Sequence, residues 1–281
     1  MTLHRPKTRF RPFLLFFLVL FALIVQGCFH SSSGGGGKIG VTPDANPTGY
    51  YDVSGTASVG DGSGGTLTIT DLQGLVNGTR FIAISDANGL VYDGTMTEIN
   101  TDDFTATVSV FQDGTLITTA PVTGMITAGA KITGTLTGSG LGSGSFELIY
   151  ALSNDTAAAL SRVQNMPNFF WFDRVGGGQA VGLGFAVDAE GNVTNFFSAS
   201  DGTFNQCIVD SGVISPVTST SLYTLNLTLS SCSNTAVDGD YSGLASMRTE
   251  SIEDPVGDRL VLVVSNLSFS IQGEFKLGED G

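Results

Sequence analysis

Histidine is nearly absent from this chain of 281 residues, where the only two are His4 and His30. Everything after residue 30 therefore lacks an imidazole, which excludes Ser-His-Asp and Cys-His catalysis, histidine-ligated zinc and ordinary histidine acid–base chemistry there. No G-x-x-x-x-G-K-[ST] phosphate loop occurs, and Gly178, Gly182 and Gly184 do not match the spacing of a dinucleotide fingerprint. The sequence predicts no catalytic residue, no cofactor and no metal, and thus a protein that is not an enzyme.

Charge is also scarce, and most of it is acidic. Asp, Glu, Lys and Arg make up 14% of the chain, against about a quarter in a typical globular protein. Four of the 12 basic residues precede Cys28, which leaves eight against 26 acidic residues, a formal charge of −18. A surface of this charge repels nucleic acid and anionic lipid headgroups, so we expect neither as a partner.

A hydrophobic run follows a basic N-terminus. Arg5, Lys7, Arg9 and Arg11 carry the positive charge, and all 13 residues from 13 to 25 are apolar. This length is typical of the apolar region of a secretory signal peptide. A membrane-spanning helix needs about 20 such residues, so the run indicates export more than a permanent span.

The four residues that end this run, Val25-Gln26-Gly27-Cys28, resemble the lipobox of bacterial lipoproteins. The resemblance implies cleavage before Cys28 and fatty acylation, such as palmitoylation, of its sulfur and its new amino group. Two or more acyl chains anchor a protein stably to a membrane. Phe29 stands where an Asp would favour retention in the inner membrane, so the resemblance implies an outer-membrane lipoprotein on the periplasmic or surface face. An uncleaved anchor and simple secretion are the alternatives.

A flexible tether is predicted between the lipid and the folded part. Residues 30–37 (HSSSGGGG) offer no apolar side chain to bury, and Gly/Ser runs behave as flexible coil. Pro43 and Pro47 continue this composition. We therefore expect residues 1–27 to be a signal peptide and residues 28–47 to be the acylated cysteine and its tether.

The remainder is predicted to be all-β, with antiparallel barrel or sandwich lobes. Glycine is abundant, with 38 residues, and apolar side chains alternate with Thr or Ser, as in a strand with one buried face. Residues 104–110 and 223–229 show this period of two, and two hairpins are predicted at 180–197 and 260–271. Further strands are expected at 51–59, 66–71, 80–85, 91–98, 131–137 and 145–152.

One short helix is expected to connect two β lobes. Asn154-Asp155-Thr156 form a helix cap before an alanine-rich run, and the helix is expected to end near Asn165, before Pro167. The predicted division is an N-terminal lobe at 48–152, a helical linker at 153–167 and a C-terminal lobe at 168–281. A weak similarity between residues 49–51 (GYY) and residues 239–241 (GDY) makes duplication of the lobes a possibility to test.

Cysteine usage predicts one disulfide. With Cys28 acylated, Cys207 and Cys232 remain as an even pair in an oxidising compartment. A bridge closing this loop stabilises the fold by about 3.5 kcal/mol in the chain-entropy model. A redox-active thiol pair is the alternative, but the C-x-x-C spacing is absent.

Several polar clusters are candidate sites, and a structural role is expected for each. Paired carboxylates can hydrolyse glycosides, but adjacent acids are far more often turn residues or solvated. Calcium binding is disfavoured because the twelve-residue loop with its terminal Glu is missing. Trp171 is expected in core packing, with a ligand pocket as the alternative. The alternating glycines of 138–144 are expected in a flexible hairpin connection, with a strand that permits close approach of another backbone as the alternative. The acidic clusters are Asp102-Asp103, Asp238/Asp240 and Glu250/Glu253/Asp254, and the calcium alternative concerns Asp188–Asn192 or Asp238–Asp240.

A set of short motifs resembles a group of Gram-negative β-rich lipoproteins with no assigned activity. The motifs are residues 49–51 and 146–150, Trp171, residues 188–192, Cys207, residues 223–229, Cys232 and residues 241–245. The resemblance implies a non-enzymatic β scaffold or binding module at the cell envelope, with an envelope protein or glycan as partner. The alternative is a lipocalin-like carrier of a small apolar ligand, which requires an interior cavity of roughly 300 Å³ or more.

Overall fold

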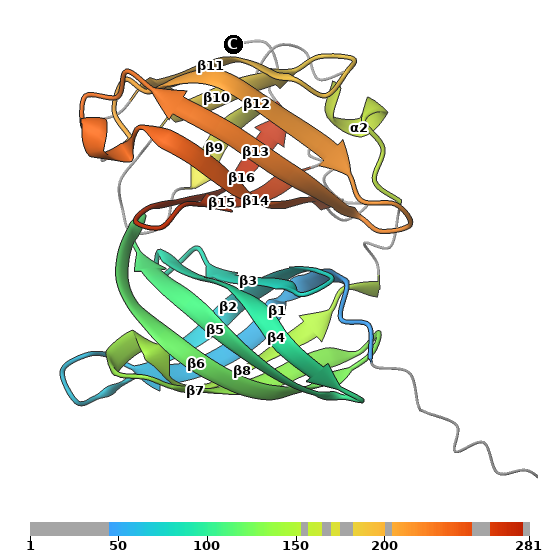
Figure 1. Ribbon diagram of the computed structural model, residues 1–281, viewed down its shortest axis with the longest axis vertical. Helices are drawn as coiled ribbons and strands as arrows, with labels where there is room; N and C mark the ends of the chain where they lie inside the picture. Colours follow the sequence, from blue (N-terminus) through green and yellow to red (C-terminus); the bar gives the residue numbers. More distant parts are fainter. Residues whose placement is uncertain are drawn as a thin grey trace, which may run out of the picture. The chain divides into compact units, whose positions relative to one another are not determined.

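The first eight strands close into an antiparallel barrel (Figure 1). The computed structural model describes residues 45–152, 157–164, 170–174, 182–199, 204–248 and 259–277. The strands are β1 (Gly49–Gly60), β2 (Thr66–Asn77), β3 (Arg80–Ser85), β4 (Leu90–Asn100), β5 (Asp103–Gln112), β6 (Thr115–Thr127), β7 (Lys131–Thr137) and β8 (Ser143–Tyr150). Each pairs with the next along the chain, and β8 pairs with β1. The predicted antiparallel all-β fold is confirmed.

Alternation of apolar and hydroxyl side chains explains why these segments form a barrel. Along β5, Phe104 and Ala106 are buried, whereas Thr105 and Thr107 are exposed. Successive side chains of a strand point to opposite faces of the sheet, so closing the sheet places one apolar face of each strand inside the barrel. All eight strands contribute to a single buried hydrophobic cluster.

Eight further strands follow in the described chain. They are β9 (Phe170–Arg174), β10 (Gly182–Val187), β11 (Val193–Ala199), β12 (Ile208–Pro216), β13 (Leu222–Ser230), β14 (Gly239–Arg248), β15 (Arg259–Ser265) and β16 (Ser270–Leu277). Six of them form a sheet in the order β12-β13-β14-β15-β16-β9, and β10 pairs with β11. β9 lies beside β10, and β11 lies beside β12. The first and last strands, β9 and β16, are paired as β1 and β8 are in the barrel.

The disulfide joins the open end of the β12–β13 hairpin. Ile208 and Ser230 are the last paired residues there, and the bridge between Cys207 and Cys232 lies just beyond them, with an S–S distance of 2.04 Å. Both cysteines are buried in the hydrophobic cluster of the C-terminal sheet. The backbone N–H of Cys232 also donates to Oδ1 of Asp238, at 3.1 Å. The predicted bridge is confirmed.

The similarity between residues 49–51 and 239–241 arises because the same local motif occurs at both places. The hydroxyl of Tyr51 donates to the carbonyl oxygen of Pro47, and that of Tyr241 to the carbonyl oxygen of Val237, each at 2.8 Å and four residues back. The glycine two positions before each tyrosine has a positive φ, +156° at Gly49 and +138° at Gly239, so the chain can enter the strand sharply. Such tyrosine corners fix the start of a strand. They occur in β1 and β14, which are not equivalent in strand order, so this similarity does not support duplication.

The predicted helical linker contains a shorter helix than expected. Helix α2 (Ser161–Gln164) is preceded by non-helical backbone at 157–160, and residues 153–156 and 165–167 lie outside the described residues. Hydrogen bonds to the sheet explain the late start: Ala158 N–H donates to Thr220 O at 2.6 Å, and the Tyr223 hydroxyl donates to Ala159 O at 3.0 Å. The N–H groups of Ala158 and Ala159 are thus engaged by Thr220 and Tyr223, and the first turn of the helix begins with the hydrogen bond from Arg162 N–H to Ala159 O, at 3.0 Å.

The outer face of the barrel contacts the C-terminal sheet. Ile82 of the barrel and Leu244 of the sheet belong to one buried apolar cluster. Beside it, the Arg80 guanidinium contacts Oδ2 of Asp93 at 2.7 Å and donates to the carbonyl oxygen of Ser242 at 2.9 Å. The side chain of Asp93 is only 8% exposed. Apolar contact and a buried ion pair therefore hold the two parts together.

Candidate functional site

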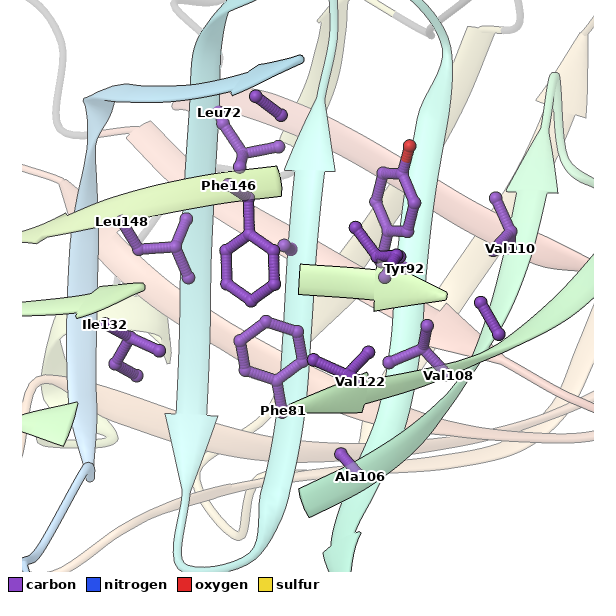
Figure 2. Packing of buried hydrophobic residues seen from close by; sticks show 14 of the residues in the cluster. Leu72, Phe81, Tyr92, Ala106, Val108, Val110, Val122, Ile132, Phe146 and Leu148 are labelled. Carbon is purple, nitrogen blue, oxygen red and sulfur yellow. The ribbon is translucent and has the colours of Figure 1, made fainter. Parts of the chain in front are cut away.

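The interior of the barrel is filled by side chains (Figure 2). The ring centroid of Phe81 lies 5.6 Å from that of Phe146 and 6.4 Å from that of Phe104. These rings and their aliphatic neighbours leave a cavity of about 10 Å³, against the roughly 300 Å³ that a small-molecule site needs. The barrel as it stands has no space for an apolar ligand.

A short 3-10 turn, η1 (Gly140–Gly142), closes part of the interior. Leu141 is buried there, and its carbonyl oxygen accepts a hydrogen bond from the Tyr92 hydroxyl at 3.1 Å. Burial raises the pKa of Tyr92 above its usual range, so the hydroxyl stays protonated as a donor. Gly144 has a φ of +133°, and a Cβ there would collide with the carbonyl oxygen of Ser58. The glycine-rich segment 138–144 thus combines a tight turn with a close approach of two strands.

A groove lies on the outer face of the barrel. Its volume is about 690 Å³, and its lining comes from the ends of β4 and β5 and from β6, β7 and β8. We call it the barrel groove. Exposed Thr105, Thr123, Thr135 and Ser145 form one wall, and exposed Asp103 and Met125 with half-buried Thr133 form the other.

Glycine and aromatic residues form the floor of the barrel groove. Phe104, Gly124, Gly134 and Phe146 are paired in series across β5 to β8. A Cβ on Gly134 would lie 2.5 Å from the Phe146 ring, and one on Gly124 would lie 2.6 Å from the Phe104 ring. The rings thus occupy the space that side chains would take, as in the aromatic rescue of strand glycines. The groove consequently has a well-packed base.

One wall of the barrel groove is a regular row of hydroxyl groups. Thr105 is paired with Thr123, Thr123 with Thr135, and Thr135 with Ser145, so four neighbouring strands each contribute one hydroxyl. We call these four residues the hydroxyl row. The Thr105 hydroxyl lies 3.0 Å from that of Thr97. Within the described residues, the hydroxyls of Thr123, Thr135 and Ser145 make no side-chain hydrogen bond and are free to bind a ligand.

The barrel groove is acidic. Glu98, Asp103 and Asn100 line one end, and no lysine or arginine of the described chain lines it. Lys131, on β7, is paired instead with Glu147 at 2.8 Å. The groove therefore offers hydroxyl, amide and carboxylate groups without a positive charge.

A similar groove of about 630 Å³ lies on the outer face of β12, β13 and β14. Its floor is formed by Gly212, Leu227 and Tyr241, which are paired in series. Its polar wall differs from that of the barrel groove, because Ser211 Oγ lies 3.2 Å from Thr228 Oγ1, which donates to Asp240 Oδ1 at 2.7 Å. These hydroxyls are therefore already paired with one another or with a carboxylate.

The acidic clusters considered in the sequence are dispersed in the structure. Asp103 lines the barrel groove, and the adjacent Asp102 is exposed in the β4–β5 turn. Asp238 and Asp240 accept hydrogen bonds from Cys232 N–H and the Thr228 hydroxyl, which are structural roles.

Asp188 forms a local turn. Its Oδ2 accepts from the side-chain amide of Asn192 at 2.8 Å, and its Oδ1 accepts from the backbone N–H of the same residue at 2.8 Å. These hydrogen bonds lower the pKa of Asp188. In the described part of the chain, no group of three or more His, Cys, Asp and Glu side chains could hold a metal ion.

Some predicted sites lie outside the described residues. These are Cys28, residues 28–44 of the predicted tether and the cluster Glu250/Glu253/Asp254. Residues 45–47 were wrongly assigned to the flexible tether, because Ala45 packs against the barrel core and buried Pro47 accepts the hydrogen bond of the Tyr51 hydroxyl. Trp171 lies on β9, where its backbone pairs with Lys276 of β16.

No protein-family model, no curated protein and no solved structure matches this chain. No described helix is long and apolar enough to span a bilayer. The candidate site therefore rests on the geometry of the grooves.

The hydroxyl row was not identified from the sequence. Alternation along residues 104–110 indicated an exposed face carrying Thr105 and Thr107, but the strand that contributes Thr123 was not predicted. The available signal was a Thr at every fourth position in 115–127, at 115, 119, 123 and 127. The register that places Thr123 between Thr105 and Thr135 depends on pairing between strands.

Proposed function

We propose that this protein is a lipid-anchored binding module of the bacterial outer membrane that works without catalysis. The main support for this proposal is the contrast between the inner and the outer face of the barrel wall. The interior has a cavity of about 10 Å³, whereas the outer face has an open groove of about 690 Å³. A filled barrel with a polar groove outside suits recognition of a partner at the surface.

The proposed anchor is the lipid on Cys28. The basic N-terminus, the apolar run and the small residue before Cys28 support export, processing and acylation. The tether of residues 28–44 would hold the β domains away from the bilayer, and the formal charge of −18 on the processed chain would oppose their contact with anionic headgroups. The outer faces would then be accessible to an envelope protein or glycan.

The absence of catalysis is part of the proposal and is supported by how the polar residues are used. No histidine follows His30, and Asp188, Asp238 and Asp240 are engaged in hydrogen bonds that shape turns and strand ends. Burial raises the pKa of Tyr51 and Tyr241, which keeps both hydroxyls protonated in their corners. None of these groups is arranged as a nucleophile with its base.

Two measurements in cells test this function. Labelled palmitate should be incorporated into the wild-type protein and not into the Cys28→Ala variant, and only the wild type should fractionate with outer membranes. Chemical crosslinking of intact envelopes should then yield a discrete adduct for the wild type. Absence of label from a wild type that retains residues 1–27 would refute the anchor, and absence of any adduct or ligand would refute the binding role.

A further inference from the structure

We propose that the barrel groove binds an extended glycan that lacks acidic groups, with the hydroxyl row contacting successive sugar units. This inference rests on the proposed binding function and specifies its ligand. Thr105, Thr123, Thr135 and Ser145 supply one hydroxyl from each of four adjacent strands, along a groove of about 690 Å³.

The repeat distance of the hydroxyl row favours a glycan over an extended peptide. Neighbouring strands lie about 4.8 Å apart, which is close to the length of one sugar unit in an extended β-linked chain. Side chains on one face of an extended peptide repeat about every 6.8 Å. The side chains of a bound peptide would therefore lose register with the hydroxyls of the row within two contacts. Four strands span about 14 Å between the first and last hydroxyl, the length of a short oligosaccharide.

The chemistry of the barrel groove matches sugar hydroxyls. Threonine and serine hydroxyls both donate and accept hydrogen bonds, the Asn100 amide does the same, and the carboxylates of Glu98 and Asp103 accept from ligand hydroxyls. Met125, 48% exposed on the opposite wall, offers an apolar surface to the C–H face of a sugar ring. The same carboxylates, with no cation beside them in the described lining, repel acidic sugars.

The curvature of the barrel limits the ligand to this groove. The row continues in register from Ser145 to Ser58 and from Ser58 to Thr68, but the sheet curves continuously as it closes. A straight oligosaccharide therefore leaves the surface beyond β8. This predicts a site for about four sugar units, one for each strand from β5 to β8.

The groove on β12, β13 and β14 is not proposed as a glycan site. Its hydroxyls at Ser211 and Thr228 are engaged with each other and with Asp240, so a ligand would have to break those bonds. In the barrel groove, the hydroxyls of Thr123, Thr135 and Ser145 are available.

The test is calorimetric titration of the full-length processed protein in a sugar-free detergent. The probes are cellotetraose and the N-acetylglucosamine tetramer as uncharged chains, tetragalacturonate as an acidic chain, and an extended lysine-rich peptide. We expect at least one uncharged tetramer to bind and tetragalacturonate to remain unbound. The double variant Thr123→Val, Thr135→Val should bind the same tetramer about tenfold more weakly, because two hydrogen bonds are lost.

Two controls locate the site. Thr95→Val changes an exposed threonine that does not line the barrel groove and should leave binding unchanged. Valine favours strands as threonine does, so each variant should unfold at nearly the wild-type temperature. The double variant Glu98→Gln, Asp103→Asn keeps only a neutral acceptor oxygen at each position, so it should bind the uncharged tetramer more weakly than the wild type and gain binding of tetragalacturonate.

The outcomes separate the two proposals. If neither uncharged tetramer binds while crosslinking still captures a partner, the glycan site is wrong and the binding module stands. Binding of the lysine-rich peptide alone would assign the groove to a protein partner and overturn the glycan. Tetramer binding that the Thr123/Thr135 variant leaves unchanged would place the ligand elsewhere and overturn the role of the row. Loss of both the tetramers and every crosslinked partner would overturn the binding function itself.

Discussion

The packing of Phe146 against Gly134 makes a prediction that the structure quantifies. Phe146 is buried inside the barrel, against Phe81, and its ring covers the position where a Cβ on Gly134 would lie. Phe146→Ala removes that ring and should lower the free energy of unfolding by about 3–5 kcal/mol. Gly134→Ala pushes a methyl group to 2.5 Å from the ring and should cost about 1–3 kcal/mol by overpacking.

The two changes should compensate each other. In the Phe146→Ala background the contact with the ring is gone and the nearest remaining atom to this methyl group is the carbonyl oxygen of Thr123, at 3.2 Å, so the same substitution should cost much less. The expected coupling free energy is about 1–3 kcal/mol, well above the roughly 0.5 kcal/mol within which independent sites add. Gly124→Ala is the control, because its Cβ would meet the carbonyl oxygen of Thr133 and, at 2.6 Å, the ring of Phe104, and not the ring of Phe146. Its cost should persist in the Phe146→Ala background.

Urea denaturation of the four proteins of this cycle, followed by far-ultraviolet circular dichroism, measures the coupling. Equal costs of Gly134→Ala in both backgrounds would refute the reasoning that the ring fills the glycine's space. A cost of Phe146→Ala below about 1 kcal/mol would show that the interior is not packed as described.

Three further predictions concern stability. Replacing Cys207 and Cys232 with serine should lower the free energy of unfolding by about 3.5 kcal/mol, measured by urea denaturation, and a change below about 1 kcal/mol would contradict it. Arg80→Ala leaves the buried carboxylate of Asp93 without its cation and should cost about 3–5 kcal/mol, whereas Arg80→Lys should restore part of the loss. Because hydrogen bonds lower the pKa of Asp188 in the folded state, its contribution to stability is present above its unfolded pKa of about 3.9 and is lost as pH falls through the lower folded pKa. Asp188→Ala should flatten that part of the pH–stability curve, and an unchanged curve would refute the assignment.

Sequence reasoning succeeded where a strand is recognisable by its own pattern. Residues 80–85 and 131–137 were predicted with the bounds of β3 and β7. The strands β6, β12 and β14 were not predicted, because Gly, Pro and polar residues interrupt their alternation. The second strand of the last hairpin was expected from 267, yet β16 begins at Ser270. The side chain of Asn266 accepts hydrogen bonds from the backbone of Ser268 and Phe269 and extends the turn.

The candidate site could not be predicted from such local patterns. Each residue of the hydroxyl row is an ordinary exposed strand residue, and only the pairing of four strands aligns them. Thr105 and Ser145 are far apart along the chain and become parts of one wall through Thr123 and Thr135. A shift of one residue in any of these pairings would turn that strand's hydroxyl toward the interior.

The sequence by itself determined the fold class, the one disulfide and the lack of histidine chemistry beyond residue 30, because alternation, cysteine number and composition are properties of the chain. The tertiary structure decided that the barrel interior is filled, that GYY and GDY mark tyrosine corners, and that a polar groove lies outside. These depend on which strands pair and in which register. That choice is made by the burial of side chains from all eight strands at once, and no single segment contains it.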